Sequence, residues 1–118
     1  MTKNFPKQYD IWVANLDPAF GSEPGRVRPV IILQSDLLNK SGHSSFVSCV
    51  ISSQHREGVS LIRLAINPTT SNGLLKQSYA LCDQVRSIDQ SRLIGKVGSL
   101  DKETINRLTE SIKVILSL

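Results

Sequence analysis

The pattern of apolar and polar positions divides the chain into a long part made of short apolar runs and a C-terminal part with helical spacing. Each short run is rich in β-branched or aromatic residues and ends at polar, glycine- or proline-containing residues, which is typical of strands and turns. The runs predict strands at residues 9–16, 30–33, 46–53, 59–66 and 79–85, with a short sixth strand around residues 96–97. We expect a loop at residues 17–29 and a turn at residues 39–45.

The C-terminal segment predicts one amphipathic helix from about Lys102 to Leu116. Its apolar residues fall on one helical face, at Ile105, Leu108, Ile112 and Ile115. The opposite face carries Glu103, Arg107, Glu110 and Lys113. Asp101 is a good N-cap because its carboxylate accepts hydrogen bonds from free amides of the first turn. Leu100 and Ile105 are spaced as a hydrophobic staple across this cap.

These elements predict a mainly β fold with a helix, in the α+β class. Five or six short strands and one closing helix favour a small, strongly bent sheet or barrel with the helix packed on it. The length of 118 residues suits a single domain, which we place at residues 1–118.

The charge distribution favours a polyanionic partner. The formal net charge is +4, and residues 36–99 carry seven Lys/Arg against four Asp/Glu, so the basic excess lies in the body of the chain. Such a field attracts nucleic acid above all, although many basic proteins of this size bind none.

Several classes of protein are disfavoured by what the sequence lacks. Cys49 and Cys82 stand singly in apolar runs, so we expect reduced, buried side chains and no metal site or other cofactor. The polar N-terminus does not resemble a signal peptide, and no apolar run approaches the roughly 20 residues that span a bilayer. We therefore expect a cytoplasmic protein with no membrane contact. His43 and His55 fall in predicted loops, where a histidine is usually solvated.

The most unusual stretch is residues 21–30, where two glycines and two prolines shape a loop that leads into a buried strand. Arg28 lies at the junction. An arginine there is costly unless its guanidinium finds an anion or several acceptors. A salt bridge to Glu23 or Asp17 and a site for a bound anion are both compatible with this position.

Three blocks of the chain resemble the MazF/PemK/Kid toxins, in the order in which that family has them. The first block consists of Asp17-Pro18, Gly21-Ser22-Glu23, Gly25 and Arg28-Pro29-Val30. The second is Val50-Ile51-Ser52-Ser53-Gln54, where the family usually has threonine at the position of Ser52. The third runs from Tyr79 to Asp89, and Arg92-Leu93 and the closing helix match as well.

The resemblance implies an SH3-like barrel of the CcdB/PemK/MazF type, a homodimer, and the toxin half of a toxin–antitoxin system. Members cleave single-stranded RNA, commonly mRNA, without a metal. The ribose 2′-hydroxyl attacks the adjacent phosphorus and leaves 2′,3′-cyclic phosphate and 5′-hydroxyl ends. The family also implies a cognate antitoxin, MazE/PemI-like, which would lay an acidic, largely disordered segment across the RNA groove.

By the same resemblance, Arg28, Ser52 and Glu23 are the expected catalytic residues. A guanidinium keeps its proton near neutral pH, so we expect Arg28 to stabilise the phosphorane first and to protonate the leaving oxygen second. Glu23 matches a loop carboxylate, either a base or an anchor for a nearby arginine. Some Kid-like members carry an arginine at the position of Leu81, so the MazF form of the chemistry fits this chain better. The expected RNA-binding residues are Ser22, Arg26, Ser53, Gln54, Asp83, Gln84 and Arg86.

Two other functions are compatible with the same barrel. CcdB, a gyrase poison, ends in Trp-Gly-Ile, whereas this chain ends in Val114-Ile115-Leu116-Ser117-Leu118 and has its single tryptophan at Trp12. A catalytically silent RNA-binding or interaction domain is the other alternative. RNA cleavage in EDTA, compared with plain RNA binding, separates them.

Overall fold

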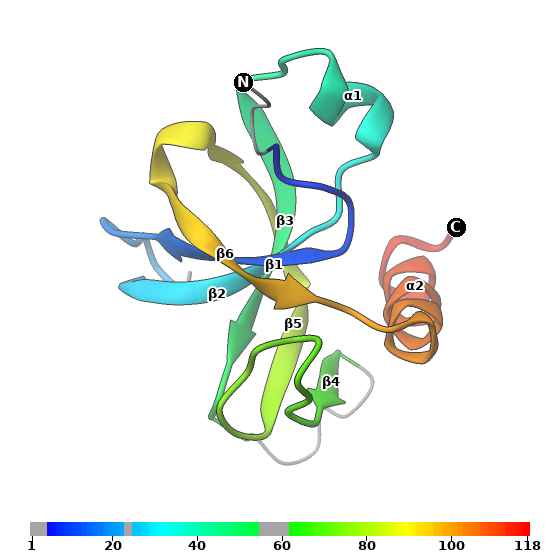
Figure 1. Ribbon diagram of the computed structural model, residues 1–118. Coiled ribbons are helices and arrows are strands. Elements are labelled where there is room, and N and C mark those ends of the chain that lie inside the picture. Colours follow the sequence, from blue (N-terminus) through cyan, green and yellow to red (C-terminus); the bar gives the residue numbers. More distant parts are fainter. Residues whose placement is uncertain (1–4, 23–24, 55–61) are drawn as a thin grey trace.

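The computed structural model describes residues 5–22, 25–54 and 62–118 (Figure 1). The strands are β1 (Asp10–Asn15), β2 (Val27–Ile32), β3 (Ser45–Ser52), β4 (Arg63–Ile66), β5 (Ser78–Asp89) and β6 (Leu93–Ser99). The helices are α1 (Asp36–Lys40) and α2 (Lys102–Leu116), with a 3₁₀ turn at Gln90–Arg92. None of the helices in these ranges is long and apolar enough to cross a membrane.

Within the described ranges, the strands form one sheet in the order β4-β5-β3-β2-β1-β6, and every neighbouring pair is antiparallel. The sheet is strongly bent, so that β3 and β5 run across β1, β2 and β6 (Figure 1). This arrangement confirms the predicted bent, mainly β fold with a C-terminal helix.

The bend gives the sheet two apolar cores. One contains Ile11, Ile31, Cys49 and Ile51 with Leu108 of α2, which is completely buried. The other contains Ala14, Val30, Phe46, Val50 and Ile88. Alternate residues of β1, β2 and β3 enter opposite cores, because successive side chains of a strand point to opposite faces. Arg28 and Ser52 therefore continue the series of Val30 and Val50 at the open end of the second core.

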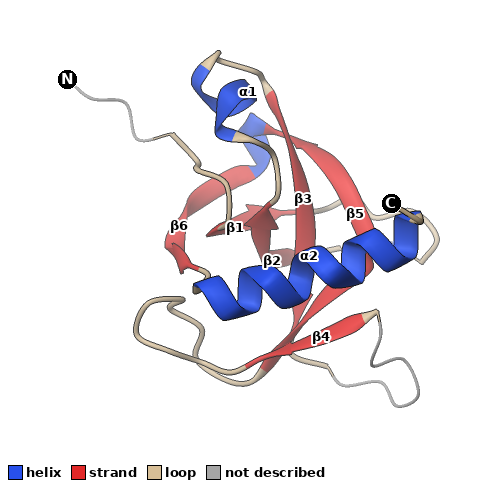
Figure 2. Cartoon of the chain, turned by 90° about the vertical axis from the view of Figure 1, so that its right-hand side faces the viewer, coloured by secondary structure: helices blue, strands red, loops and turns tan. Residues whose placement is uncertain are grey.

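Helix α2 has the predicted bounds and covers the first core (Figure 2). It contacts β4 and β5, and Ile105, Ile112 and Ile115 pack against the buried cluster around Leu108. At its start, Asp101 Oδ1 accepts a hydrogen bond of 2.7 Å from the Thr104 amide, as predicted. Hydrogen bonds from the side chain and the amide of Thr104 lower the pKa of Asp101. The four charged residues of the opposite face are exposed.

Several predicted strands have other bounds in the structure, and β5, predicted at residues 79–85, extends over Ser78–Asp89. Strand β2 begins at Val27 instead of Val30, so Arg28 lies inside a strand. The short sixth strand extends over Leu93–Ser99, because it pairs along the length of β1. The predicted strand 59–66 is observed as Arg63–Ile66, and its residues 59–61 lie outside the described ranges.

Helix α1 was not predicted. It is too short for a hydrophobic period, and polar contacts stabilise it instead. Ser35 Oγ accepts a hydrogen bond from the Leu37 amide at its N-terminus. The side chain of Asn39, 2% exposed, contacts the side chain and the carbonyl oxygen of Gln34 at 3.0 and 2.9 Å.

Candidate functional site

The loop between β1 and β2 is held in shape by its own residues. The Leu16 amide donates to the Arg26 carbonyl at 2.8 Å, and the Arg26 amide donates to Asp17 Oδ1 at 2.6 Å. Gly25 lies so close to Asp17 that a Cβ at this position would be 2.6 Å from the same carboxylate oxygen. The carboxylate of Asp17 thus organises the loop backbone.

Arg92 fastens this loop to the turn that joins β5 to β6. Its Nη1 donates to the carbonyl oxygens of Asn15 at 3.0 Å and Asp17 at 2.7 Å. Arg92 ends the 3₁₀ turn between β5 and β6, which Asp89 caps by accepting from the Ser91 amide at 2.9 Å. The family resemblance includes Arg92 but implies no function for it. Here it is a structural clamp on the loop before Arg28.

The side chain of Arg28 is half-buried and points to the end of β3. Its Nε donates to the Gly25 carbonyl at 2.8 Å, and its Nη1 lies 3.5 Å from Ser52 Oγ. No carboxylate in the described ranges lies within ion-pair distance of the guanidinium. The salt bridge to Asp17 is not formed, and Glu23 lies outside the described residues. Among the described residues, nothing neutralises the charge of Arg28.

Ser52, 8% exposed, is the partner that the structure gives to Arg28. Its Oγ also accepts a hydrogen bond of 3.2 Å from the Gln54 amide. In both contacts the hydroxyl oxygen is the acceptor, so its hydrogen is left to donate to a bound ligand. A guanidinium and a hydroxyl that both donate toward one point suit the oxygens of a phosphate group.

The other predicted residues of the two loops surround this pair. Ser22 and Arg26 are exposed in the β1–β2 loop, and Arg26 adopts a left-handed backbone with φ of 67°. Ser53 and Gln54 are exposed directly after β3. Of these four residues, Ser53 lines the same pocket as Arg28.

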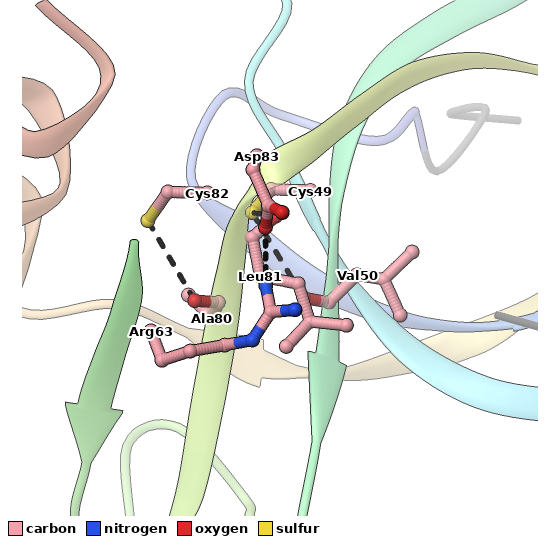
Figure 3. A network of polar contacts seen from close by, with 7 residues as sticks. All are labelled: Cys49, Val50, Arg63, Ala80, Leu81, Cys82 and Asp83. Atoms are coloured by element: carbon pink, nitrogen blue, oxygen red, sulfur yellow. Dashed lines mark hydrogen bonds and ion pairs between the residues drawn. The ribbon is translucent and has the colours of Figure 1, made fainter. Parts of the chain in front are cut away.

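The third predicted block lies along β5, and its three residues have different surroundings. Asp83 is exposed and forms an ion pair with Arg63 of the neighbouring strand β4 (Figure 3). Gln84 is half-buried. Arg86 is also half-buried, and its Nη1 is completely buried without a hydrogen-bond partner in the described part of the chain. A buried guanidinium nitrogen without a partner is costly, so Arg86 is the residue of this block most in need of an anion.

Cys82 of β5 and Cys49 of the neighbouring strand β3 are free and buried, as predicted (Figure 3). Cys49 Sγ donates to the Leu81 carbonyl at 3.3 Å, and Cys82 Sγ donates to the Ala80 carbonyl at 3.6 Å. The neighbouring Cys82 thiol, together with burial, holds the pKa of Cys49 well above its usual range. Both thiols thus belong to the core.

A pocket of about 380 Å³ adjoins Arg28. Its walls come from β1, β2, β3, β6 and the β4–β5 connection, and most of its side chains are apolar. Lys76 and Leu75 belong to that connection and line the pocket together with Arg28 and Ser53. Lys76 and Leu75 were not predicted as site residues, because neither lies in the three sequence blocks that carried the resemblance.

Comparison with known proteins identifies the family. The model of the PemK-like, MazF-like toxins of type II toxin–antitoxin systems matches residues 7–116. The chain belongs to this family. It is 32% identical over 112 residues to the endoribonuclease EndoA of Bacillus subtilis, covering 95% of each chain. It is 31% identical over 110 residues to the endoribonuclease MazF of Staphylococcus saprophyticus, covering 92% of this chain and 89% of that one.

Solved structures of PemK/MazF-like toxins have the same fold. The MazF of Deinococcus radiodurans superposes with a TM-score of 0.82 at 20% identity, over 98% of this chain and 100% of that one. The Mycobacterium tuberculosis toxin MazF-mt6 gives a TM-score of 0.74 at 24% identity, over 92% and 97%. The resemblance seen in the sequence and the predicted fold type are both confirmed. The roles of the individual residues remain predictions.

The Arg63–Asp83 ion pair generates a prediction about stability. Its side chains are 13% and 31% exposed, so solvent screens it less than it screens a surface pair. A double-mutant cycle with Arg63→Gln and Asp83→Asn, measured by urea unfolding, should give a coupling free energy of about 0.5–1 kcal/mol.

The Lys113–Glu110 pair of α2 is the matched control, with side chains 53% and 74% exposed. Its coupling should be smaller than that of Arg63 and Asp83. Equal coupling free energies would contradict the expectation that burial strengthens the Arg63–Asp83 pair.

Proposed function

We propose that this PemK/MazF-like toxin is an endoribonuclease that cleaves single-stranded RNA, principally mRNA, without a metal ion. The observation that carries the proposal is the contact between Arg28 and Ser52 at the end of the sheet, where no described carboxylate neutralises the guanidinium. The names of the two relatives, both endoribonucleases, support it. The net charge of +4 favours a polyanionic substrate.

The proposed reaction uses the substrate's own nucleophile. The 2′-oxygen attacks the adjacent phosphorus and loses its proton, the bond from phosphorus to the 5′-oxygen breaks, and the leaving oxygen gains a proton. The products are a 2′,3′-cyclic phosphate and a 5′-hydroxyl. Negative charge grows on the non-bridging oxygens in the transition state, where preorganised donors are most effective.

Arg28 and Ser52 supply such donors. The Nε contact with Gly25 fixes the plane of the guanidinium and leaves its outer nitrogens to face a phosphate. We assign to Arg28 the stabilisation of the phosphorane and, second, proton donation to the leaving oxygen. Ser52 donates to a phosphate oxygen. Glu23 remains the candidate base on the resemblance alone.

The RNA path is proposed to run from the β1–β2 loop over the end of β3 and along β5. Ser22, Arg26, Ser53 and Gln54 would contact the strand near the scissile phosphate. Further along, Gln84 has the donor and acceptor needed to read a base edge, and the half-buried Arg86 carries the charge that suits a phosphate. Asp83 is already paired with Arg63, so we propose that it positions the Arg63 side chain beside the RNA path.

We also propose that the toxin acts in the cytoplasm as a homodimer and that a cognate antitoxin inhibits it with an acidic segment. One of the similar structures is described as an endoribonuclease in complex with its cognate antitoxin. That structure has 16% sequence identity to this chain. The DNA that flanks the coding sequence is the place to seek a reading frame for the antitoxin.

Exposed apolar residues support the dimer. An apolar groove of about 330 Å³ lies between α2 and the strands β3 and β5. Beside it Leu116 is 56% exposed and Leu118 is 84% exposed. Light scattering should give twice the chain mass of 13.0 kDa. Leu118→Ser should shift the mass toward that of one chain. A monomer at all micromolar concentrations would contradict the homodimer.

Replacement of Arg28 tests the catalytic assignment. Arg28→Ala should lower the rate of RNA cleavage in EDTA by roughly 10²–10³-fold, because one preorganised donor to the phosphorane is lost. Arg107→Ala is the matched control, since Arg107 is exposed on the outer face of α2. Gel analysis of a labelled RNA gives the rate, and the cyclic-phosphate ends identify the reaction. Undiminished cutting by Arg28→Ala would overturn the role of this residue.

Ser52 is tested by a pair of substitutions. Ser52→Thr keeps the hydroxyl and adds the methyl group that restricts χ1, so activity should be equal to or higher than that of the wild type. Ser52→Ala removes the hydroxyl and should lose about tenfold or more. Both rates are measured under single-turnover conditions. If Ala and Thr give the same rate, Ser52 serves only as part of the strand.

A further inference from the structure

The pocket beside Arg28 has the features of a binding site for one nucleotide. Its volume of about 380 Å³ lies in the range of small-molecule sites. The inner walls are apolar, with Val13, Pro29, Ile51 and Val97 among them. Arg28 belongs both to this wall and to the Arg28–Ser52 pair, so the pocket adjoins the residue proposed to bind the scissile phosphate.

One side of the pocket is formed by a loop with a fixed conformation. The loop joins β4 to β5, and Asn72 at its centre is 4% exposed. Asn72 Oδ1 accepts hydrogen bonds of 3.0 Å from the amides of Thr69 and Leu74, and Nδ2 donates to the Asn67 carbonyl at 2.9 Å. A side chain that caps three backbone groups holds the loop without secondary structure.

The same loop is anchored on β6 by two glycines. A Cβ at Gly73 would lie 2.3 Å from the Val97 carbonyl oxygen, and the φ of Gly73 is +69°. A Cβ at Gly98 would lie 2.4 Å from the Ser71 carbonyl oxygen. The backbones of the loop and of β6 are thus in direct contact. The loop therefore presents its last residues at a set position beside the pocket.

Those last residues are suited to RNA. Lys76 is exposed, and Ser78 Oγ donates to its carbonyl at 3.0 Å, which fixes the backbone below the ammonium group. Leu75 is 99% exposed and packs on nothing in the described ranges. The charged residues that line the pocket are Arg28 and Lys76, and no acidic residue is among its described lining side chains. Cations on the rim suit the phosphates of a single-stranded nucleic acid, and apolar groups inside suit the face of a base.

We propose that this pocket is a nucleotide subsite of the RNA, in which Lys76 binds the phosphate next to the scissile one and Leu75 packs on the base. The inference rests on the proposed RNA-cleaving function and extends it to a loop outside the three sequence blocks from which the site residues were predicted. Lys76 acts in substrate binding and not in the chemical step. Leu75 contributes to the preference for the base beside the cut.

Lys76→Gln and Lys76→Arg test the phosphate contact. With a mixed-sequence, single-stranded RNA in EDTA, Lys76→Gln should raise KM about tenfold and leave kcat within about twofold, because a contact made equally in the ground and transition states is lost. Lys76→Arg should keep the wild-type KM. Lys40→Gln, with the same change of charge on α1 at the far end of the molecule, should leave KM unchanged (Figure 1).

A binding experiment separates this inference from the proposed activity. A 2′-O-methyl version of the RNA has no free 2′-hydroxyl nucleophile and is not cut. The slope of log affinity against log salt should fall by about one for Lys76→Gln and not for Lys40→Gln. If the wild-type protein does not cut RNA, the proposed function fails, and this binding experiment alone decides on the subsite. If Lys76→Gln and Lys40→Gln have the same KM and the same slope, the subsite is wrong.

Leu75 has its own matched control in Leu37, which is 81% exposed on α1. Leu75→Ser should weaken RNA binding about fivefold and change the distribution of bases beside the mapped cuts. Leu37→Ser should do neither. Thermal melting should be unchanged in both variants, since neither side chain is buried. An unchanged cut distribution and affinity for Leu75→Ser would remove the base contact from the proposal.

Discussion

The half-buried guanidinium of Arg28 is the feature on which the site depends: a backbone carbonyl and a hydroxyl hold it, and no carboxylate of the described ranges is paired with it. A cation taken partly out of water loses solvation, and neutral acceptors restore only part of it. The surrounding structure must therefore hold the side chain in place. The Nε bond to Gly25 does this on one side, and β3 brings Ser52 to the other.

Three connections of the sheet meet around this side chain. The β1–β2 loop is shaped by Asp17 and clamped by Arg92, and the residues after β3 extend from Ser52. The β4–β5 loop is organised by Asn72 and placed against β6 by close backbone contacts. In each loop, polar side chains form hydrogen bonds with the backbone. These bonds restrict the loop conformation and therefore the positions of the cationic side chains. This is the preorganisation that charge stabilisation in a transition state requires.

The strands and the helix were predictable because each has a local signature. The bounds of α2 and the cap at Asp101 followed from apolar spacing and from the chemistry of one residue. Helix α1 did not, since its five residues are held by contacts of Asn39 with Gln34 and not by periodicity. The identity of Arg28 as a candidate was also readable from the sequence. The residues alone did not decide between a salt bridge and an anion site, because both place the same arginine in the same loop.

The amino-acid sequence was enough to locate the strands approximately and to identify the amphipathic helix, the family, and Arg28 and Ser52 as candidates. These depend on side-chain chemistry and spacing within short segments, or on three blocks that occur in the order of the family. Only the tertiary structure decided which residues meet. The bend of the sheet brings Ser52 to Arg28 across 24 positions of the chain, pairs Asp83 with Arg63, and sets Lys76 beside the pocket. Strand order, register and close backbone packing fix such meetings, and these arise from the whole chain at once.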